Sequence, residues 1–406
     1  MIFPIFHHSN IPLFQKTFIH HSNRDYSTIP FFYGDTMTNP LQLDEKRRKA
    51  ITQCSRCGFC RAVCPIFDLT KRPITNARGK MILLKEVIEG KLPVTEAVAQ
   101  ALLRCTTCMN CTLNCPSGVD PQEVVKMMRK DMVGMGYDNL FKAMGEVVEK
   151  YGNIYGEEKR HDWGHKKEKA PYVLFLGCVG TYREEESVSE TIRLLDLLNV
   201  DFTLIDEVCC SGVLEDVGYK IKGELAQHNV REIKKTEAKT LITTCPYCYR
   251  VFEEHPAYKD LALEVNHITQ FLKDFDFQVK TEKKVTYHDP CDLGRHAGIY
   301  EEPREIIRKI ASNFVEPRRT RENAMCCGAG GGFRGAFPKE SVKIARNRLS
   351  QIIEDTGAEI LLTECPSCLH NFKNAKRQKQ NIQIYNITEF LARLYEEKVT
   401  NKKEAA

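Results

Sequence analysis

The eighteen cysteines of this 406-residue chain stand in tight clusters whose spacing suits metal binding. They occupy positions 54/57/60/64, 105/108/111/115, 209/210, 245/248, 326/327 and 365/368, with 178 and 291 standing alone. Cysteines this close in sequence do not easily form unstrained disulfides with each other. Converging thiolates suit soft metal centres instead. The spacing therefore predicts a reduced, intracellular metalloprotein.

Eight of these cysteines form a C-x₂-C-x₂-C-x₃-C-P motif that occurs twice, as in the bacterial ferredoxin run for 4Fe–4S clusters. Three thiolates in one loop cap three corners of a cube, with Gly58 or small residues letting the backbone wrap closely, and the fourth thiolate reaches the companion cluster. We therefore expect one cube on Cys54, Cys57, Cys60 and Cys115, and the other on Cys105, Cys108, Cys111 and Cys64. The alternative, zinc, needs two well-separated pairs of ligands and fits this spacing poorly.

The other ten cysteines form two matching sets, each with an isolated cysteine, an adjacent pair and a C-P-x-C. The sets are Cys178, Cys209, Cys210, Cys245 and Cys248, and Cys291, Cys326, Cys327, Cys365 and Cys368. Each C-P-x-C follows a predicted strand and opens a predicted helix, where thiolates are favoured and ligands gather. Five thiolates exceed the four that zinc or an ordinary cube needs. We interpret each set as an unusual iron–sulfur centre, with structural zinc in one lobe or free thiols as alternatives.

The elements that must position these cysteines fall into three parts. Residues 41–150 are helical in pattern, with apolar residues at helical spacing in Gly79–Ile88 and Val94–Leu103 and with Asp120 as an expected N-cap. Residues 151–170 are polar and aperiodic, as expected for a linker. Beyond them, β-like runs alternate with amphipathic helices, which predicts α/β layers with parallel strands.

The third part is internally duplicated. LITTCPYCYRVF (241–252) aligns with LLTECPSCLHNF (361–372), and VNHITQFLKDF (265–275) with YNITEFLARLY (385–395). We take 171–280 and 281–406 as two copies of one unit, which predicts two lobes related by a pseudo-two-fold axis. The fold class is thus α+β: an N-terminal helical, ferredoxin-like domain with two 4Fe–4S motifs, followed by two α/β lobes.

Composition excludes several classes of protein. Apolar residues make up 42% and charged residues 28%, as in soluble globular proteins, and the net charge of +5 is too small to indicate nucleic-acid binding. No apolar run approaches the ~18 residues of a membrane span. Residues 1–40, with little charge, are expected to be a disordered tail or upstream translation, and we expect Met37 to open the working protein.

Three further features have plain structural interpretations. The Gly330-x-Gly332-x-x-Gly335 run lacks the strand and acidic residue of a dinucleotide site, so its glycines more simply let the backbone approach a cluster or its substrate. His288 and His296 flank Cys291 and could donate protons or hydrogen bonds to thiolates, but single histidines near a strand end are more often structural. Arg78 and Lys80 could raise a cluster's potential, although a solvated helix start is the simpler interpretation.

The duplicated CCG-type motif behind two ferredoxin runs resembles the family of the heterodisulfide reductase D-subunit and its relatives, the iron–sulfur subunits of glycolate and D-lactate oxidases. The resemblance covers residues 41–400 and implies that the two five-cysteine sets hold noncubane 4Fe–4S clusters at a disulfide-cleaving site. One departure is Ser211, which follows the first cysteine pair where the family has glycine. Lobe 2 therefore matches the family motif more fully than lobe 1 does.

From this resemblance we expect an iron–sulfur oxidoreductase subunit that relays electrons through two cubes to the noncubane clusters. These would reduce the heterodisulfide of coenzymes M and B, a reaction of methanogenesis. The alternative is an electron-transfer subunit of a glycolate- or D-lactate-type 2-hydroxyacid dehydrogenase. A membrane cytochrome b or flavoprotein partner is implied, and no nucleic acid. We expect a cytoplasmic protein, or one held at the membrane surface through its partner.

Overall fold

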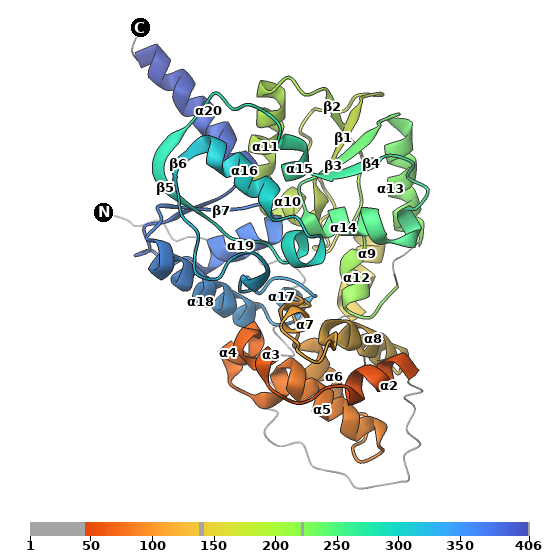
Figure 1. The fold of residues 1–406 in the computed structure, drawn as a ribbon. Coiled ribbons are helices and arrows are strands. Elements are labelled where there is room, and N and C mark those ends of the chain that lie inside the picture. Colours follow the sequence, from red (N-terminus) through yellow and green to blue (C-terminus); the bar gives the residue numbers. More distant parts are fainter. Residues whose placement is uncertain (1–44, 138–141, 221–222, 405–406) are drawn as a thin grey trace, which may run out of the picture.

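The fold is taken from a computed structural model that describes residues 45–137, 142–220 and 223–404 (Figure 1). The expected tail, residues 1–40, lies outside these ranges. A helical N-terminal region packs against two lobes that each contain a sheet of parallel strands, and it lies close to the short helices α12 (Gly212–Asp216) and α17 (Phe333–Ala336). Within the described ranges, no helix combines the length and apolar character needed to cross a bilayer.

The N-terminal region is built from short helices around an apolar core. Asn76 caps α5 by accepting from the Gly79 amide, and Asp120 caps α8 by accepting from the Glu123 amide at 3.1 Å. The capping role predicted for Asp120 is therefore confirmed. The helices are α2 (Glu45–Thr52), α3 (Phe59–Val63), α4 (Pro65–Thr70), η2 (Pro73–Thr75), α5 (Ala77–Ile88), α6 (Glu96–Leu103), α7 (Asn110–Leu113), α8 (Pro121–Gly134) and α9 (Lys142–Tyr151).

Lobe 1 is a four-stranded parallel sheet in the order β2-β1-β3-β4, with helices as crossovers. Its apolar strands are buried on both faces, as expected of parallel sheets. Its elements are β1 (Tyr172–Phe175), α10 (Gly177–Arg183), α11 (Glu185–Leu197), β2 (Phe202–Leu204), α12 (Gly212–Asp216), α13 (Gly223–Lys235), β3 (Thr240–Thr243), α14 (Pro246–Glu254), η3 (Pro256–Tyr258), β4 (Glu264–His267) and α15 (Ile268–Leu272).

Lobe 2 repeats this arrangement in the parallel order β6-β5-β7-β8. The strands β4, β6 and β8 were not predicted, because these short sheet-edge strands mix polar and apolar residues and lack a hydrophobic run. The elements are β5 (Thr281–Tyr287), a π-helical turn η4 (Asp292–His296), α16 (Glu301–Ile310), β6 (Ala311–Phe314), η5 (Arg321–Asn323), α17 (Phe333–Ala336), α18 (Pro338–Thr356), β7 (Ile360–Thr363), α19 (Pro366–Ala375), β8 (Gln383–Asn386) and α20 (Ile387–Glu404).

The two lobes pack reciprocally, as a pseudo-two-fold pair should. Helix α11 of lobe 1 contacts α20 of lobe 2, and the equivalent pair with the lobes exchanged, α16 and α15, is also in contact. One hydrophobic core runs through both lobes, with Leu195 and Ile268 from lobe 1 and Ile307 and Leu391 from lobe 2. The mixed helix and parallel-sheet architecture predicted from the duplication is therefore confirmed.

The polar stretch 151–170 has no helix or strand beyond Tyr151, in agreement with its aperiodic sequence. It nevertheless packs along the edge of lobe 1. The Leu204 amide donates to the His165 carbonyl at 2.8 Å, and Arg160 donates to the Ile205 carbonyl at 2.7 Å. This segment therefore covers the open edge of β2.

Candidate metal centres

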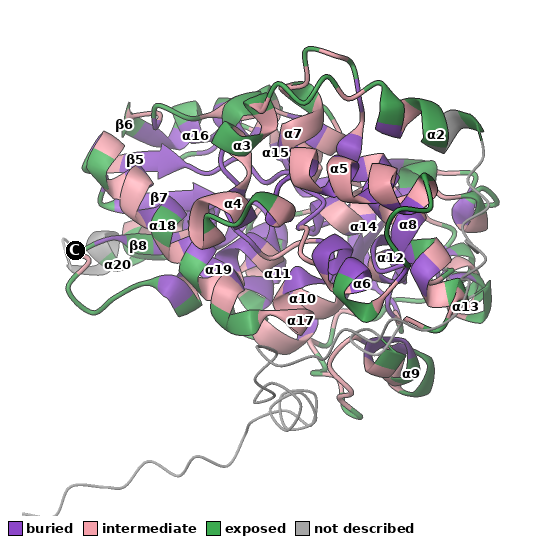
Figure 2. Ribbon diagram, turned by 90° about the horizontal axis from the view of Figure 1, so that it is seen from below, coloured by how far each residue is buried: buried purple, intermediate pink, exposed green. Residues whose placement is uncertain are grey.

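The first ferredoxin-type run converges with the last cysteine of the second run. Cys54, Cys57, Cys60 and Cys115 line one hollow near the surface, which Cys111 of the second run also lines. Burial together with the charges of Cys54, Cys57 and Cys115 raises the pKa of Cys60. Gly58 allows the close loop by adopting a φ of +92°. Cys57 is exposed, and much of α3 lies on the surface (Figure 2). This set lies at the outer end of the molecule.

The second run converges with Cys64, deeper in the molecule. Burial raises the pKa of Cys64 to about 12, opposed by the positive charge of Lys80, while Cys105 and Cys108 raise it further. The Cys64 sulfur caps α4 by accepting from the Phe67 amide at 3.5 Å. Burial also raises the pKa of Cys111, with the charges of Cys105, Cys108 and Cys64 adding to the effect.

Lys80 is not at a solvated helix start, and that interpretation was wrong. Its side chain is only 2% exposed, and its ammonium donates to the carbonyls of Thr75 and Arg104 at 2.5 and 3.1 Å. The apolar positions of α5 predict which face of the helix is buried. They do not show that the carbonyls of Thr75 and Arg104 lie where they can accept hydrogen bonds from a buried ammonium. The result is a positive charge beside the second cysteine set.

In each lobe, the predicted cysteines meet at the carboxyl ends of the parallel strands. Cys245 and Cys365 are the N-caps of α14 and α19, each followed by proline at the first helical position. The other cysteines follow the remaining strands: Cys178 after β1, Cys209 and Cys210 after β2, Cys248 in α14, Cys291 after β5, Cys326 and Cys327 after β6, and Cys368 in α19.

The five sulfurs of each lobe form one continuous series of contacts. In lobe 1 the order is Cys178, Cys209, Cys210, Cys248 and Cys245, and in lobe 2 it is Cys291, Cys326, Cys327, Cys368 and Cys365. The Cys210–Cys248 and Cys327–Cys368 sulfurs are 3.5 and 3.1 Å apart. Hydrogen bonds from the flanking thiols lower the pKa of Cys210 and Cys327 well below the ordinary value, so the middle thiol of each series loses its proton more easily than its neighbours do.

Ser211 reproduces the turn that Gly328 makes in the other lobe. Both residues have positive φ, +66° and +87°, and each amide donates to the first sulfur of the pair before it, at 3.3 Å to Cys209 and 3.2 Å to Cys326. Serine therefore keeps the geometry of the lobe 1 pair.

Cys108 of the ferredoxin-type region touches the cysteines of lobe 2. It forms a buried cluster with Cys291 and Cys326, and the hydrogen bond from Cys326, helped by the charge of Arg295, lowers the pKa of Cys108 to about 5 despite burial. Arg295 fixes the junction by donating to the carbonyls of Cys108 and Ala324, both at 2.6 Å. The second cysteine set and the lobe 2 set are thus adjacent.

His296 has the structural role that its isolation indicated, because its ring nitrogens contact the Arg250 guanidinium and the Thr107 carbonyl.

The glycine run of residues 330–335 lies against the loop that contains Thr106 and Thr107. A Cβ on Gly331 would lie 2.8 Å from the Thr107 hydroxyl and 2.9 Å from the Thr106 carbonyl carbon. The glycines thus allow close backbone approach to the loop between Cys105 and Cys108.

Arg129 was missed from the sequence, where it is one of several basic residues on an amphipathic helix. It is 1% exposed and joins all three parts of the molecule. Its guanidinium donates to the carbonyls of Leu102, Leu103, Cys105, Asp216 and Gly331.

The two lobe sets also approach each other. A hydrogen bond with Cys368 lowers the pKa of Cys365, but burial and the negative charge of Cys245 in lobe 1 outweigh it and raise the pKa. The N-cap cysteines of α14 and α19 are therefore electrostatic neighbours across the pseudo-two-fold axis.

The residues present fit metal centres. All eighteen cysteines are free thiols, and nine of the ten in the lobes are buried. Adjacent buried thiolates repel one another and are costly to keep in an apolar interior without a compensating cation. Soft thiolate ligands select iron–sulfur clusters, zinc or Cu(I).

Comparison with known proteins agrees with this geometry. A 4Fe-4S dicluster domain family matches residues 50–119, and a cysteine-rich domain family, CCG, matches residues 172–253 and 285–373. The D-subunit of the dihydromethanophenazine:CoB–CoM heterodisulfide reductase of Methanosarcina acetivorans is 30% identical over 382 residues, which cover 84% of this chain and 93% of that protein. The chain belongs to the heterodisulfide reductase D-subunit family. It is accordingly an iron–sulfur subunit of oxidoreductase type.

Members and relatives of the heterodisulfide reductase D-subunit family differ in their stated reactions. The EtfAB:quinone oxidoreductase of Syntrophomonas wolfei is 24% identical to this chain, over 84% of the chain and 58% of that protein. Among solved structures, a hypothetical protein from Helicobacter pylori aligns with 87% of this chain and 73% of its own, with a TM-score of 0.57 and 10% identity. This last likeness concerns the fold alone.

Proposed function

We propose that this chain is the iron–sulfur subunit of an enzyme that reduces a heterodisulfide of the coenzyme M–coenzyme B type. In this proposal Cys54, Cys57, Cys60 and Cys115 hold one 4Fe–4S cube, and Cys105, Cys108, Cys111 and Cys64 hold the other. The ten lobe cysteines hold two noncubane clusters. When bound, such clusters carry single electrons, and those in the lobes supply the iron that binds and cleaves a disulfide.

The observation that supports an electron relay is the arrangement of the four cysteine sets in one series, while the heterodisulfide substrate is supported by the similarity to the Methanosarcina acetivorans D-subunit over 93% of that protein. Cys60 raises the pKa of Cys111 in the second set, Cys108 of that set touches Cys326 of lobe 2, and Cys245 of lobe 1 raises the pKa of Cys365. The series runs from the exposed Cys57 to the paired lobes. Protein-bound redox centres need such neighbouring sites, and the protein's task is to hold and insulate them.

The reaction needs two electrons and two protons. The S–S bond breaks, each sulfur takes one electron and one proton, and two thiols are released. A partner must supply the electrons, and we propose a membrane cytochrome b or flavoprotein subunit. The partner would dock near Cys57, which is exposed. The neighbouring side chain of Phe59 is 64% exposed and offers an apolar contact beside the first cysteine set.

A second candidate is an electron-transfer subunit that binds no disulfide, as in a glycolate- or D-lactate-type 2-hydroxyacid dehydrogenase. The similarity to the EtfAB:quinone oxidoreductase of Syntrophomonas wolfei favours this candidate, since that protein's name refers to no disulfide. Both candidates use the same series of cysteine sets and differ at the lobes.

The two candidates are separated by turnover of the anaerobically purified chain with its partner. Oxidation of a reduced viologen dye is measured with the coenzyme M–coenzyme B heterodisulfide, and dye reduction is measured with glycolate or D-lactate. We expect turnover with the heterodisulfide and a loss of at least tenfold in Cys327→Ala. Turnover with the hydroxyacids together with none with the heterodisulfide would contradict the proposal and favour the second candidate.

A further inference from the structure

His288 occupies the position in lobe 2 that Phe175 occupies in lobe 1. In the two sheets Leu174 pairs with Ile242, and Tyr287 pairs with Leu362 in the same register. Phe175 and His288 come next in the chain, Phe175 as the last residue of β1 and His288 directly after β5. Both rings pack edge-to-face on equivalent phenylalanines, Phe175 on Phe252 and His288 on Phe372, each with ring centroids 4.8 Å apart. Packing at this site is therefore satisfied by a phenyl ring, and the histidine adds only its two nitrogens.

Within the part of the chain that the structure describes, neither nitrogen is paired with another nitrogen or with an oxygen, and the side chain that interacts with the ring is the thiol of Cys327. His288 is only 1% exposed, and both Nδ1 and Nε2 are buried. A buried polar atom without a partner destabilises the folded state. The corresponding site of lobe 1 accepts phenylalanine, so the histidine of lobe 2 adds buried nitrogens that only the neighbouring sulfurs, or a metal held by those sulfurs, can engage.

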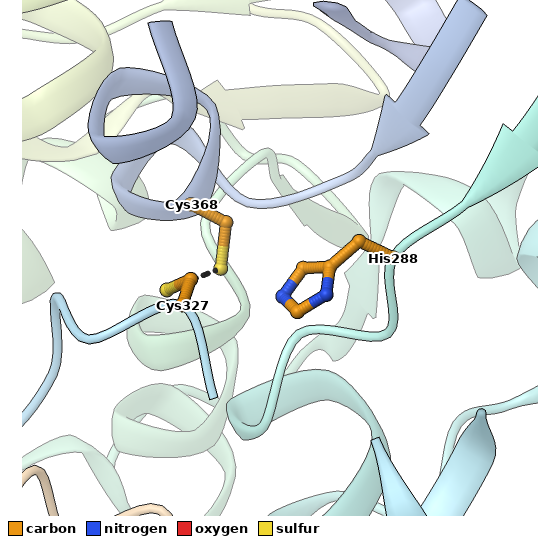
Figure 3. Close-up of side chains that lie close together, drawn as sticks. All are labelled: His288, Cys327 and Cys368. Atoms are coloured by element: carbon orange, nitrogen blue, oxygen red, sulfur yellow. Dashed lines mark hydrogen bonds between the residues drawn. The ribbon is translucent and has the colours of Figure 1, made fainter. Parts of the chain in front are cut away.

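The imidazole points toward two sulfurs of the lobe 2 set (Figure 3). One ring nitrogen of His288 and the sulfurs of Cys327 and Cys368 all lie within 4.8 Å of one another. Cys327 follows β6, Cys368 lies in the first turn of α19, and His288 follows β5, so three separate elements direct their ligand atoms to one point. Imidazole nitrogen and thiolate sulfur are both ordinary ligands of iron and zinc.

We propose that His288 is a nitrogen ligand of the metal centre in lobe 2, beside Cys327 and Cys368, while the lobe 1 centre with Phe175 has sulfur ligands only. The inference rests on the proposed iron–sulfur function. Imidazole is a neutral ligand, and nitrogen ligation raises the reduction potential of iron–sulfur centres. The two lobes, alike in fold, would then hold electronically different centres, with the more positive potential in the lobe that touches Cys108.

The test is pulsed EPR on the partly reduced, anaerobically purified chain, with iron and zinc measured on the same samples. The wild-type chain, grown with ¹⁴N- or ¹⁵N-histidine, should show a strong histidine-nitrogen coupling that changes with the isotope. His288→Phe, which copies lobe 1 and keeps the packing on Phe372, should lose that coupling. His267→Asn, a buried histidine with Asn386 as its lobe 2 counterpart, should keep it.

Absence of an isotope-sensitive coupling in the wild-type chain would overturn the proposal, even if the His288→Phe chain failed to fold. A coupling that persists in His288→Phe would also overturn it. Metal analysis tests the proposed function separately. If zinc replaces iron, the proposed function falls, and X-ray absorption at the zinc edge then tests His288 by whether one nitrogen neighbour is lost in His288→Phe.

Discussion

Cys108 of the ferredoxin-type region and Cys326 of lobe 2 lie in one buried cluster, which they share with Cys291. Arg295 holds the two loops together through the carbonyls of Cys108 and Ala324. Two motifs far apart in the sequence thus share one interior. Redox centres bound at these motifs would be direct neighbours, and no further residue would have to mediate between them.

The crossed assignment of the fourth cysteines is testable by iron content. Removing Cys54, Cys57 and Cys60 as a triple alanine variant should abolish the outer cube, a loss of about four iron atoms. Adding Cys115→Ala to this variant should cost no more iron, because Cys115 serves the same cube. Adding Cys64→Ala should damage the remaining cube and lower the iron content again. The reverse pattern would show that each run keeps its own four cysteines.

Arg129 should dominate the attachment of the N-terminal region to the lobes. Arg129→Met leaves carbonyls of Leu102, Cys105, Asp216 and Gly331 without their charged donor. We expect the free energy of unfolding to fall by about 3–5 kcal/mol, measured by denaturant titration under anaerobic conditions.

The matched control for Arg129 is Arg308→Met, whose half-exposed side chain pairs with Glu301 at the surface of α16. It should change the free energy of unfolding by no more than about 0.5 kcal/mol. Equal effects of the two substitutions would contradict a special role for Arg129.

Exchanging serine and glycine in the turns after the two cysteine pairs, at Ser211 and Gly328, should change the stability of the chain by different amounts. A Cβ on Gly328 would lie 2.9 Å from the Ile344 Cβ in a backbone with φ +87°, so Gly328→Ser should destabilise the chain by about 1–3 kcal/mol. Ser211→Gly should change stability by less than about 1 kcal/mol, because glycine adopts φ +66° freely. Thermal unfolding of both variants measures this difference, and an unaffected Gly328→Ser chain would show that the lobe 2 turn is not constrained.

His267 should make the lobes less stable in acid. Burial lowers its pKa to about 3, whereas the unfolded side chain titrates near 6.5. Below about pH 6.5 the unfolded chain therefore binds one more proton, and the free energy of unfolding falls by up to about 1.4 kcal/mol per pH unit. His267→Asn keeps a capping oxygen but cannot be protonated. Denaturant midpoints at pH 7.5 and 5.5 should differ less in this variant, and an unchanged difference would exclude His267 as the source.

Local chemistry explains what could be predicted from the sequence. Proline after Cys245 and Cys365 marks a helix start, Asp120 before Pro121 marks a cap, and the aligned repeats require two lobes of one topology. Contacts made by docking leave no such local signal. Three features depend on how segments far apart in the sequence pack together. These are the contact of Cys108 with Cys326, the burial of Lys80 and the five carbonyls around Arg129.

His288 is another residue whose role could not be predicted from local sequence. Its position after a strand was visible in the sequence, but a single histidine there is usually structural. The sheet register gives His288 the position that Phe175 has in lobe 1, and burial of both ring nitrogens distinguishes it from an ordinary structural histidine. The difference between His288 and Phe175 becomes visible only once the strand register of both sheets is known.

The central claim is that these cysteines hold four iron–sulfur centres, and metal analysis of oxygen-free protein tests it most directly. Iron, acid-labile sulfide and zinc should be quantified per chain after anaerobic purification or reconstitution. We predict brown protein with about sixteen iron atoms and as many sulfides per chain, and zinc well below one. Colourless protein, or zinc at one or more per chain in place of iron, would contradict the claim.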